Sequence, residues 1–598
     1  MTETGVRPAS TRDRRVRYVG LLGAVALTVS AYAGGALPDS ITTRAGHPFP
    51  AVLLWLLGTT AMVGAWWTLR AGARSTGWAL RTAALWTMPL LVSAPLGSRD
   101  VYSYACQGWV YAEGGDPYAT GVAEAGCPWL DAVAPVWRDT AAPYGPFFVL
   151  LAALAVVLGG SLAGTLVLLR VLAVSGLLLA TLCLPGLARA AGVPPARATW
   201  LVLACPLVGV HLVSGAHNDA VMLGLLLLGL LLLVRRPTSA AGVSPGVAGS
   251  SGVAGSSGVA ALPGGAGLST GGRTSGAGQP STARVPPGVA GSPGGGLPPG
   301  VAGWPAVGAL LVAGVLLGLA VSVKATAVVV LPFAALAAVR GRYTVAALLR
   351  DGGLLAAGVL GALLVSSLVS SLGLGWIGGL GSSGDTVQWT SPPTAVGMLV
   401  DYLGEAVGLP PVGVPVARIA ALLLLAVLLV LLWWRTWSTL HGSRVTAPPE
   451  TRGGFRDAAP PETLHGFRDA APSGPPAASA TGNGPPAAVG VGPSTVSAGV
   501  SRRRSVLLGA GLALALTVVL APVFHPWYAT WPLALLALAA TRTTWFLVPV
   551  AAASFLALPD GTNVARLVKA PGAVAMTLLM VVLAVRFLSR MRRNRESR

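Results

Sequence analysis

A short polar segment, SRDVYSY, contains the acid that is best placed for chemistry. Asp100 follows Arg99 at the end of a long apolar run, where a carboxylate is costly unless it is solvated, paired or used. One carboxylate near a sugar hydroxyl can remove the proton as that oxygen attacks, without any metal. The alternative is that Asp100 only pairs with a neighbouring arginine or caps a helix over residues 101–113.

Further polar groups follow in the same stretch of the chain. Asp116 lies in GGDPY, which favours a turn because Gly, Asp and Pro each do so. Arg138 precedes Asp139 in VWRDTAAPYGP, and its guanidinium either binds a phosphate or forms a simple ion pair. Tyr144 stands at the entry to the next helix, where the proline two residues later is tolerated in the first turn.

Three consecutive polar residues, His217, Asn218 and Asp219, lie where one apolar run gives way to the next. Polar residues at such a position cost free energy unless they have a functional role. The alternative is that they only cap a loop between the two runs. Lys324 separates two later apolar runs, where it can snorkel or neutralise a lipid phosphate.

The elements that must position these residues are hydrophobic helices. The 598 residues are 54% hydrophobic and only 10% charged, with a mean hydropathy of +0.71, which is wrong for a protein dissolved in water. Because backbone amides in lipid must be satisfied within their own segment, and no ten-residue alternating pattern appears, the sequence predicts an all-α polytopic membrane protein.

About fifteen apolar runs approach the roughly 20 residues that cross a hydrocarbon core. They are residues 17–36, 50–69, 76–95, 146–163, 164–185, 197–213, 216–234, 306–322, 325–339, 353–374, 412–434, 505–523, 529–540, 543–557 and 571–588. The net charge of +20 comes from basic clusters, which we attribute to membrane topology rather than to nucleic-acid binding. The positive-inside rule places these clusters and both termini in the cytoplasm. Two cytoplasmic termini require an even number of spans, so one assignment between 146 and 213 must be wrong.

Two low-complexity segments divide the chain. Residues 237–303 contain the repeat GVAGSSGVAGSSGVA, and residues 438–503 contain PETRGGFRDAAP followed by PETLHGFRDAAP. Both are predicted to be disordered cytoplasmic loops. They separate membrane regions at 1–236, 304–437 and 504–598.

The remaining loops are predicted to be external, at 96–145, 375–411, 524–528 and 558–570. Helices are expected in two of them, an interfacial one over 101–113 and an amphipathic one over 394–409.

The four cysteines show no spacing typical of a metal site, so no zinc site is predicted. Cys106 and Cys127 share one predicted external loop, where oxidation is permitted, and whether they pair is left open. Cys183 and Cys205 have the character of helix-packing residues.

A last motif, HPWY, contributes His525 as a titratable ring and Trp527 as a surface for a sugar face. For each polar residue alone, an interfacial anchor is the alternative. Asp100, Arg138, Lys324 and His525 are nevertheless all predicted on the outer side. A base, several cations and aromatic walls suit transfer from a phosphate-linked lipid, because cations stabilise the departing phosphate while the carboxylate activates the acceptor.

The ordered motifs SRDVYSYACQGWVYAEGGDPY, WRDTAAPYGP, SGAHNDAVMLG, TSPPTAVG (390–397) and HPWY (525–528) resemble the actinobacterial polyprenol-phosphomannose-dependent alpha-1,6-mannopyranosyltransferases. These are GT-C membrane glycosyltransferases, so the resemblance implies a GT-C-like bundle of about 13–15 transmembrane helices. It covers most of the hydrophobic core. It implies inverting transfer of mannose from beta-linked polyprenyl phosphate to the 6-hydroxyl of an alpha-1,6-mannan, as in lipomannan and lipoarabinomannan synthesis. No cofactor is firmly implied, and the need for a divalent cation is left open.

In such enzymes the first large external loop bears the catalytic carboxylate, which maps onto Asp100. The match is by content, because two helices precede the span that leads into this loop. The resemblance implies candidate ligands of the donor phosphate, which are Arg99, Arg138, Lys324 and His525. It implies candidate residues of the sugar pocket, which are Tyr102, Asp116, Tyr144, Asn218, Asp219 and Trp527, and His217 is a further candidate for substrate binding.

The expected setting is the plasma membrane, with the active site outside. The expected partners are a polyprenyl-phosphate-linked mannose donor, a mannosylated glycolipid acceptor and membrane lipids, and no nucleic acid. Another transferase that uses a polyprenyl-phosphate sugar is one alternative. A polyprenyl-lipid transporter is another, although it should show internal repeats and broken helices near the bilayer midplane, and no such repeat is found.

Overall fold

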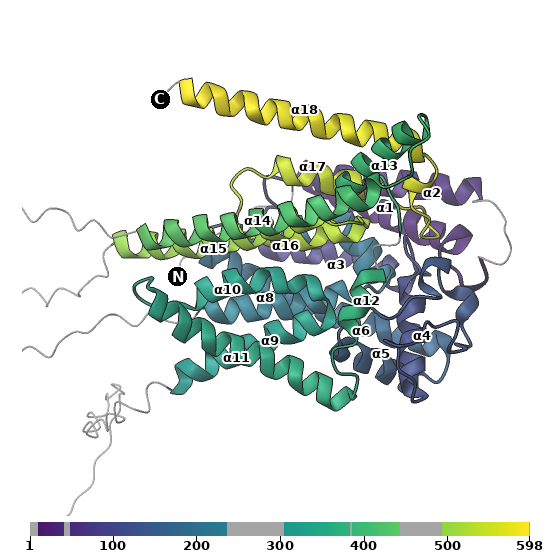
Figure 1. Cartoon of the computed structure of the whole chain (residues 1–598), viewed down its shortest axis with the longest axis horizontal. Helices are drawn as coiled ribbons and strands as arrows, with labels where there is room; N and C mark the ends of the chain where they lie inside the picture. The colour runs from purple at the N-terminus through teal and green to yellow at the C-terminus, as the bar shows by residue number, and fades with distance from the viewer. Residues whose placement is uncertain (1–9, 41–47, 236–303, 383–385, 443–492, 597–598) are drawn as a thin grey trace, which may run out of the picture.

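The computed structural model describes residues 10–40, 48–235, 304–382, 386–442 and 493–596. The regular secondary structure in these ranges is helical, apart from one isolated bridge between Ala557 and Asn563. Most helices run along the long axis of the molecule (Figure 1). The α-helices are α1 Thr11–Gly34, α2 Phe49–Thr68, α3 Thr76–Val92, α4 Asp100–Ala112, α5 Pro146–Gly159, α6 Leu162–Ala190, α7 Pro195–Leu203, α8 Asp219–Arg235, α9 Trp304–Val323, α10 Leu331–Ala338, α11 Val345–Ser370, α12 Trp376–Ser382, α13 Pro392–Glu405, α14 Gly413–Gly442, α15 Pro493–Leu520, α16 Thr530–Ala539, α17 Thr544–Ala553 and α18 Lys569–Glu596.

Shorter helical turns connect them. These are η1 Pro38–Ser40, η2 Leu130–Ala132, η3 Pro135–Trp137, the π-helical turn η4 Val208–Ser214, η6 Ala325–Val330, η7 Pro526–Ala529 and η8 Val564–Arg566.

The prediction of an all-α polytopic membrane protein is confirmed. In the described ranges seven helices are long and apolar enough to cross a membrane, or eight if one bent pair counts as a span; the seven are α1, α2, α6, α11, α14, α15 and α18. The other predicted runs are also helical, and most of them form shorter helices, such as α8 with 17 residues and α16 with 10. Length and hydropathy of the described helices therefore assign spans to about half of the fifteen runs.

The region where one assignment had to be wrong contains that bent pair. The expected span 197–213 is broken between α7 and the π-helical turn η4, which meet at 63°. Pro206 lies in the break, where its ring and missing N–H prevent a continuous helix. One broken helix is a feature that a transporter would also show, so the bend alone does not decide the function.

The boundaries of one predicted loop need correction. Helix α14 continues to Gly442 and α15 begins at Pro493, so both ends of the expected loop 438–503 are helical. Proline is well tolerated in the first turn of a helix, which suits the start of α15. The expected loop at 237–303 lies outside the described residues, as does the middle of the second.

The predicted helices of the external loops are confirmed as helices. The helix expected over 101–113 is α4, and the amphipathic helix expected over 394–409 is α13. Helix α4 packs on α5 at one end of the bundle, whereas α13 lies against α14 and α18.

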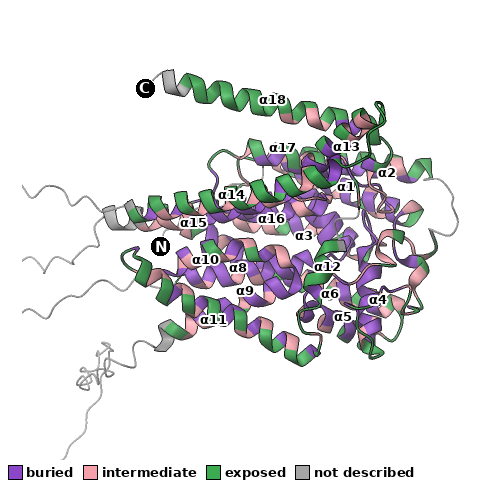
Figure 2. Ribbon diagram, viewed as in Figure 1, coloured by how far each residue is buried: buried purple, intermediate pink, exposed green. Residues whose placement is uncertain are grey.

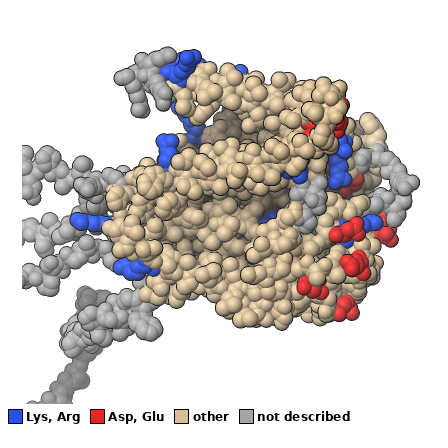
Figure 3. All heavy atoms as spheres, in the orientation of Figure 1, with Lys and Arg blue, Asp and Glu red and all other residues tan. Residues whose placement is uncertain are grey.

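Buried residues and charged residues are distributed differently in the molecule. The buried residues concentrate in the middle of the bundle, around α8, α9 and α16, while α14 and α18 expose apolar side chains along their length (Figure 2). Charges are distributed unevenly along the long axis: the acids in this view gather around α4, whereas lysine and arginine occur among them and also form groups at the end where α8 and α14 finish (Figure 3). This polarity is the one that the positive-inside rule predicts.

Candidate active site

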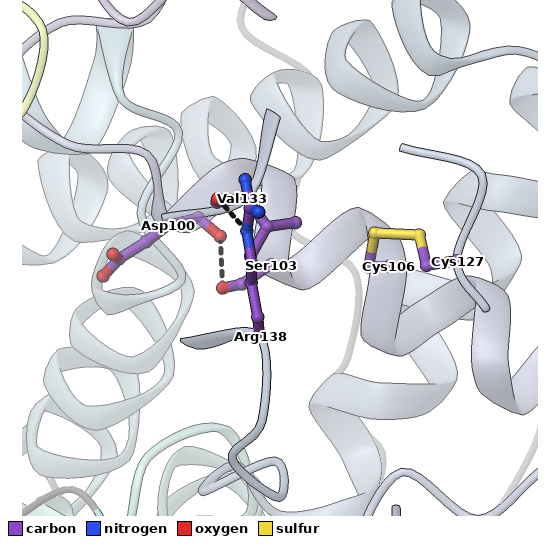
Figure 4. Close-up of a disulfide and its surroundings, with 6 residues drawn as sticks. All are labelled: Asp100, Ser103, Cys106, Cys127, Val133 and Arg138. Atoms are coloured by element: carbon purple, nitrogen blue, oxygen red, sulfur yellow. Dashed lines mark hydrogen bonds between the residues drawn. A yellow bond between two sulfur atoms is a disulfide. The ribbon is translucent and has the colours of Figure 1, made fainter. Parts of the chain in front are cut away.

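The first turn of α4 holds Asp100 in place. The carboxyl Oδ1 accepts a hydrogen bond from the indole N–H of Trp137 at 3.1 Å, and the backbone N–H of Asp100 donates to Ser98 Oγ at 3.1 Å. Further along the helix, a disulfide joins Cys106 to Cys127 and fixes α4 to the loop that follows it (Figure 4). The pairing left open by the sequence is therefore present.

Asp100 opens onto a cavity of about 280 Å³ at this end of the bundle. Five separate segments line it, which is why no single motif defines it. The lining residues are Gly97, Ser98, Arg99, Asp100, Ala134, Pro135, Val136, Trp137, Thr386, Gln388, His525, Pro526, Trp527, Ala557, Asp560, Gly561, Thr562, Asn563 and Arg566.

A chain of buried polar residues lies beneath Asp100. His217 Nδ1 is 3.8 Å from Asp100 Oδ2 and 3.7 Å from Asp219 Oδ2. Asp219 in turn receives Lys324 Nζ at 2.8 and 2.9 Å and the indole N–H of Trp531. His217 thus lies between the two carboxylates and connects Asp100, by contact, to the buried ion pair.

Aromatic rings form one wall of the cavity. The His525 ring stacks on Trp527 with 4.6 Å between ring centroids, and the Trp527 ring lies 4.2 Å from that of His217. Burial lowers the pKa of His525 to about 4, although the nearby Asp100 carboxylate opposes this change. His525 is therefore a neutral ring at physiological pH, so a role as a ligand of the donor phosphate would rest on hydrogen bonding rather than on a positive charge.

The cations expected to bind a donor phosphate separate into two groups. Arg99 lines the cavity and donates to the Ala132 carbonyl at 3.1 Å. Arg138 points elsewhere, because its guanidinium donates to the carbonyls of Val133 at 3.1 Å and Asp131 at 3.3 Å (Figure 4). Lys324 is only 9% exposed and its ammonium is held by Asp219, and neither Arg138 nor Lys324 is among the residues that line the cavity.

The residues expected in the sugar pocket also separate. Trp527 lines the cavity, whereas Asn218 and Asp219 lie fully buried below it. Tyr102 donates its hydroxyl to the Ala36 carbonyl at 2.6 Å and is completely buried. Tyr144 packs edge-on against Tyr104, 5.2 Å between ring centroids. Both tyrosines support the fold around α4.

Asp116 is exposed and has a structural role. Its carboxyl Oδ1 accepts the backbone N–H of Tyr118 at 2.8 Å, which closes the turn that GGDPY favours. The turn positions Tyr118, whose hydroxyl donates to the Tyr144 carbonyl at 2.8 Å.

Several cavity residues were missed from the sequence. Trp137 lies in the VWRDTAAPYGP motif but was not singled out, and the polar Gln388 and Asn563 belong to no recognisable motif. Arg566 did carry a signal, because a cation in a predicted external loop runs against the positive-inside rule. Within the described ranges, no group of three His, Cys, Asp or Glu side chains is arranged to hold a metal ion.

The chain is similar in sequence to known proteins over most of its length. A family model described as "Alpha-(1->6)-mannopyranosyltransferase, N-terminal domain" matches residues 17–268, and one described as "MptB C-terminal domain" matches residues 485–586. Alpha-(1->6)-mannopyranosyltransferase A of Mycobacterium tuberculosis is 30% identical over 446 residues, covering 70% of this chain and 71% of that relative. The chain belongs to the alpha-(1->6)-mannopyranosyltransferase family.

Other members of the family match the chain over a larger share of its length. A second alpha-(1->6)-mannopyranosyltransferase of M. tuberculosis is 27% identical over 88% of this chain and 79% of the relative. Alpha-(1->6)-mannopyranosyltransferase B of Corynebacterium glutamicum is 25% identical over 93% of this chain and 79% of the relative. No solved structure gives a significant match. The family resemblance seen in the motifs is thus confirmed, and the mannosyltransferase is a membrane glycosyltransferase.

Proposed function

We propose that this mannosyltransferase transfers mannose from beta-linked polyprenyl phosphate to the 6-hydroxyl of an alpha-1,6-mannan acceptor, in lipomannan and lipoarabinomannan synthesis. The observation that carries the proposal is the placement of Asp100. Its carboxylate lies at a cavity with aromatic walls and two arginines, Arg99 and Arg566. These are the groups that a sugar, an attacking hydroxyl and a departing phosphate require.

The reaction is a single displacement in this proposal. Asp100 takes the proton of the acceptor 6-hydroxyl as its oxygen attacks C1 of mannose from the face opposite the phosphate. The bond between C1 and the phosphate oxygen breaks, and its electron pair stays with the phosphate. One in-line displacement converts the beta configuration into alpha. Trp137 and His217 keep the carboxylate oriented toward the acceptor through the contacts described above.

The proposed location of the site is the outer face of the plasma membrane, with both termini in the cytoplasm. Two observations support this orientation. The acids and the cavity lie at the end opposite the basic cluster, as the positive-inside rule requires. The Cys106–Cys127 disulfide lies at that same end, and disulfides persist in oxidising compartments.

The first experiment measures mannose transfer by purified protein reconstituted in nanodiscs. The donor is polyprenyl-phosphate mannose and the acceptor is a short alpha-1,6-mannoside. We expect Asp100→Asn to lose at least about a hundredfold in kcat, the usual scale for removing a general base. The matched control is Asp139→Asn, which makes the same change at an exposed carboxylate in the same loop and should keep full activity.

Two results would contradict the proposal in different ways. Turnover retained by Asp100→Asn would exclude Asp100 as the base. A wild-type protein that elongates the acceptor only with a polyprenyl-phosphate pentose would keep the mechanism and reject mannose as the sugar.

A further inference from the structure

The loop between α17 and α18 is fastened to the segment that carries Asp100. The backbone N–H of Gly97 donates to the Pro559 carbonyl at 3.0 Å. Gly561 lies against Ser98 so closely that a Cβ atom there would be 2.9 Å from the Ser98 Cα. Gly561 also has φ of +92°, a conformation that glycine adopts without strain. The loop therefore packs directly against the start of α4.

The same loop is fastened on its other side to the segment before α13. Asn563 Nδ2 donates to Gln388 Oε1 at 2.9 Å, and the indole N–H of Trp389 donates to the Ala565 carbonyl at 3.0 Å. Asn563 also caps the short helical turn η8 by accepting the backbone N–H of Ala565 at 2.8 Å. Arg566 ends this turn, so its backbone is held from both sides.

Arg566 differs from Arg99, Arg138 and Lys324, the other cations considered as ligands of the phosphate. It lines the same cavity as Asp100, its side chain is exposed, and among the described residues none forms an ion pair or hydrogen bond with its guanidinium. Lys324 is neutralised by Asp219, and Arg138 is held by backbone carbonyls. Arg99 shares the cavity with the carboxylate of Asp560, which acts on it electrostatically.

Apolar surface continues from Arg566 into the last helix. Leu567 and Val568 follow it directly and are 63% and 44% exposed, and Leu578 on α18 is 59% exposed. Helix α18 contacts α13 near its start and stands away from the bundle beyond it (Figure 1). A ligand with a phosphate and a long hydrocarbon chain would therefore meet a cation at the cavity and an apolar path along α18.

We infer that Arg566 binds the phosphate of the lipid-linked donor and holds it as it leaves. This inference rests on the proposed function. The guanidinium fork matches two phosphate oxygens. The phosphate carries one negative charge as a diester in the donor, and between about 1.5 and 2 as the monoester product. Arg566 consequently binds the product more strongly than the donor, and it lowers the barrier to cleavage of the sugar–phosphate bond.

The experiment compares Arg566→Gln and Arg566→Lys with Lys569→Gln, which removes the next cation along the chain, at the start of α18. We expect Arg566→Gln to raise the donor KM by about tenfold to a hundredfold, the scale of one charged hydrogen-bonding group. The inhibition constant of free polyprenyl phosphate should rise by a larger factor than the KM, because the product carries more charge. Arg566→Lys should raise the donor KM and the inhibition constant less than Arg566→Gln does. Lys569→Gln should have the wild-type values of both constants.

Direct binding of polyprenyl phosphate to the purified protein tests the role of Arg566 separately from the proposed mannose transfer, because this measurement needs no sugar and no turnover. Weaker binding by Arg566→Gln than by Lys569→Gln supports the inference even if mannose proves to be the wrong sugar. Equal binding by both, or a KM and an inhibition constant that rise by the same factor, would overturn it. If Arg566→Gln does not fold, Arg566→Lys decides: its product binding must be weaker than that of wild type.

Discussion

The ion pair of Asp219 and Lys324 has to be explained at the level of single residues, because both side chains are almost completely removed from solvent. Charges are rarely left within apolar surroundings unless they are paired or used. Here Asp219 of the pair contacts the His217 ring, and the same ring contacts Asp100. In the proposed mechanism the pair would therefore serve the reaction indirectly, through the His217 ring that lies against Asp100.

His525 provides a prediction about pH. Its folded-state pKa is about 4, against 6.5 for a solvated ring, because burial disfavours the charged form. Between these values the unfolded chain binds the proton and the folded protein does not. The stability that the neutral ring contributes is therefore fully present above pH 6.5 and is lost as the pH falls toward 4.

The measurement is thermal unfolding in detergent across this pH range. We expect His525→Gln to abolish an acid-induced loss on the order of 3 kcal/mol in the free energy of unfolding. Equal pH dependence in the variant and the wild type would mean that the ring is solvated and titrates normally.

Of the candidate site residues named from sequence, some line the cavity and others lie away from it, for definable reasons. Asp100 and Trp527 were recognisable because polar or aromatic groups at the end of an apolar run indicate a functional role. Arg138 and Lys324 lie away from the cavity, which could not be foreseen because a free cation and a cation held by a carbonyl or a carboxylate look the same in sequence. Only the folded chain shows which guanidinium remains available.

Helix positions were more predictable than helix shapes. Apolar runs must become helices in lipid because their amides have no other partner, so nearly every run reappears as a helix. The break between α7 and η4 was not predicted, because proline inside a membrane helix is tolerated where neighbouring groups satisfy the backbone. The contact of the 557–566 loop with Ser98 joins segments far apart in sequence and leaves no local pattern.

Packing of α4 on α5 yields a prediction at the level of elements. Gly108 faces Ala152 so closely that a Cβ atom would lie 2.6 Å from its carbonyl carbon. Because that neighbour is backbone and cannot rotate away, Gly108→Ala must displace α4, and Asp100 moves with it. We expect a loss of at least about 1 kcal/mol in stability, the lower range for overpacking, together with reduced kcat.

The matched control is Gly361→Ala in α11, where a Cβ atom would meet nothing within 4 Å. That change should leave kcat unchanged and stabilise the helix slightly, since alanine is the better helix former. If Gly108→Ala also proves silent, α4 is not fixed tightly enough against α5 to position the base.

The charge distribution of the whole molecule predicts its orientation in the membrane. A group of basic residues and the turn between α10 and α11 lie at one end without acids in this view, whereas the acids lie at the other end, together with the cavity and some further basic residues (Figures 1 and 3). Glu124 and Arg342 are exposed and mark these two ends. A cysteine at either position should report which end faces the medium.

The prediction is that a membrane-impermeant maleimide applied to intact cells labels Glu124→Cys and leaves Arg342→Cys unlabelled until the membrane is opened. The native background should be low, because Cys106 and Cys127 are joined and Cys183 and Cys205 are buried. The reverse pattern would place Asp100 in the cytoplasm, where a disulfide is rare and sugar nucleotides are at hand. Orientation and donor chemistry are thus tested together, since an outward-facing cavity can draw its activated sugar only from a donor that crosses or resides in the membrane.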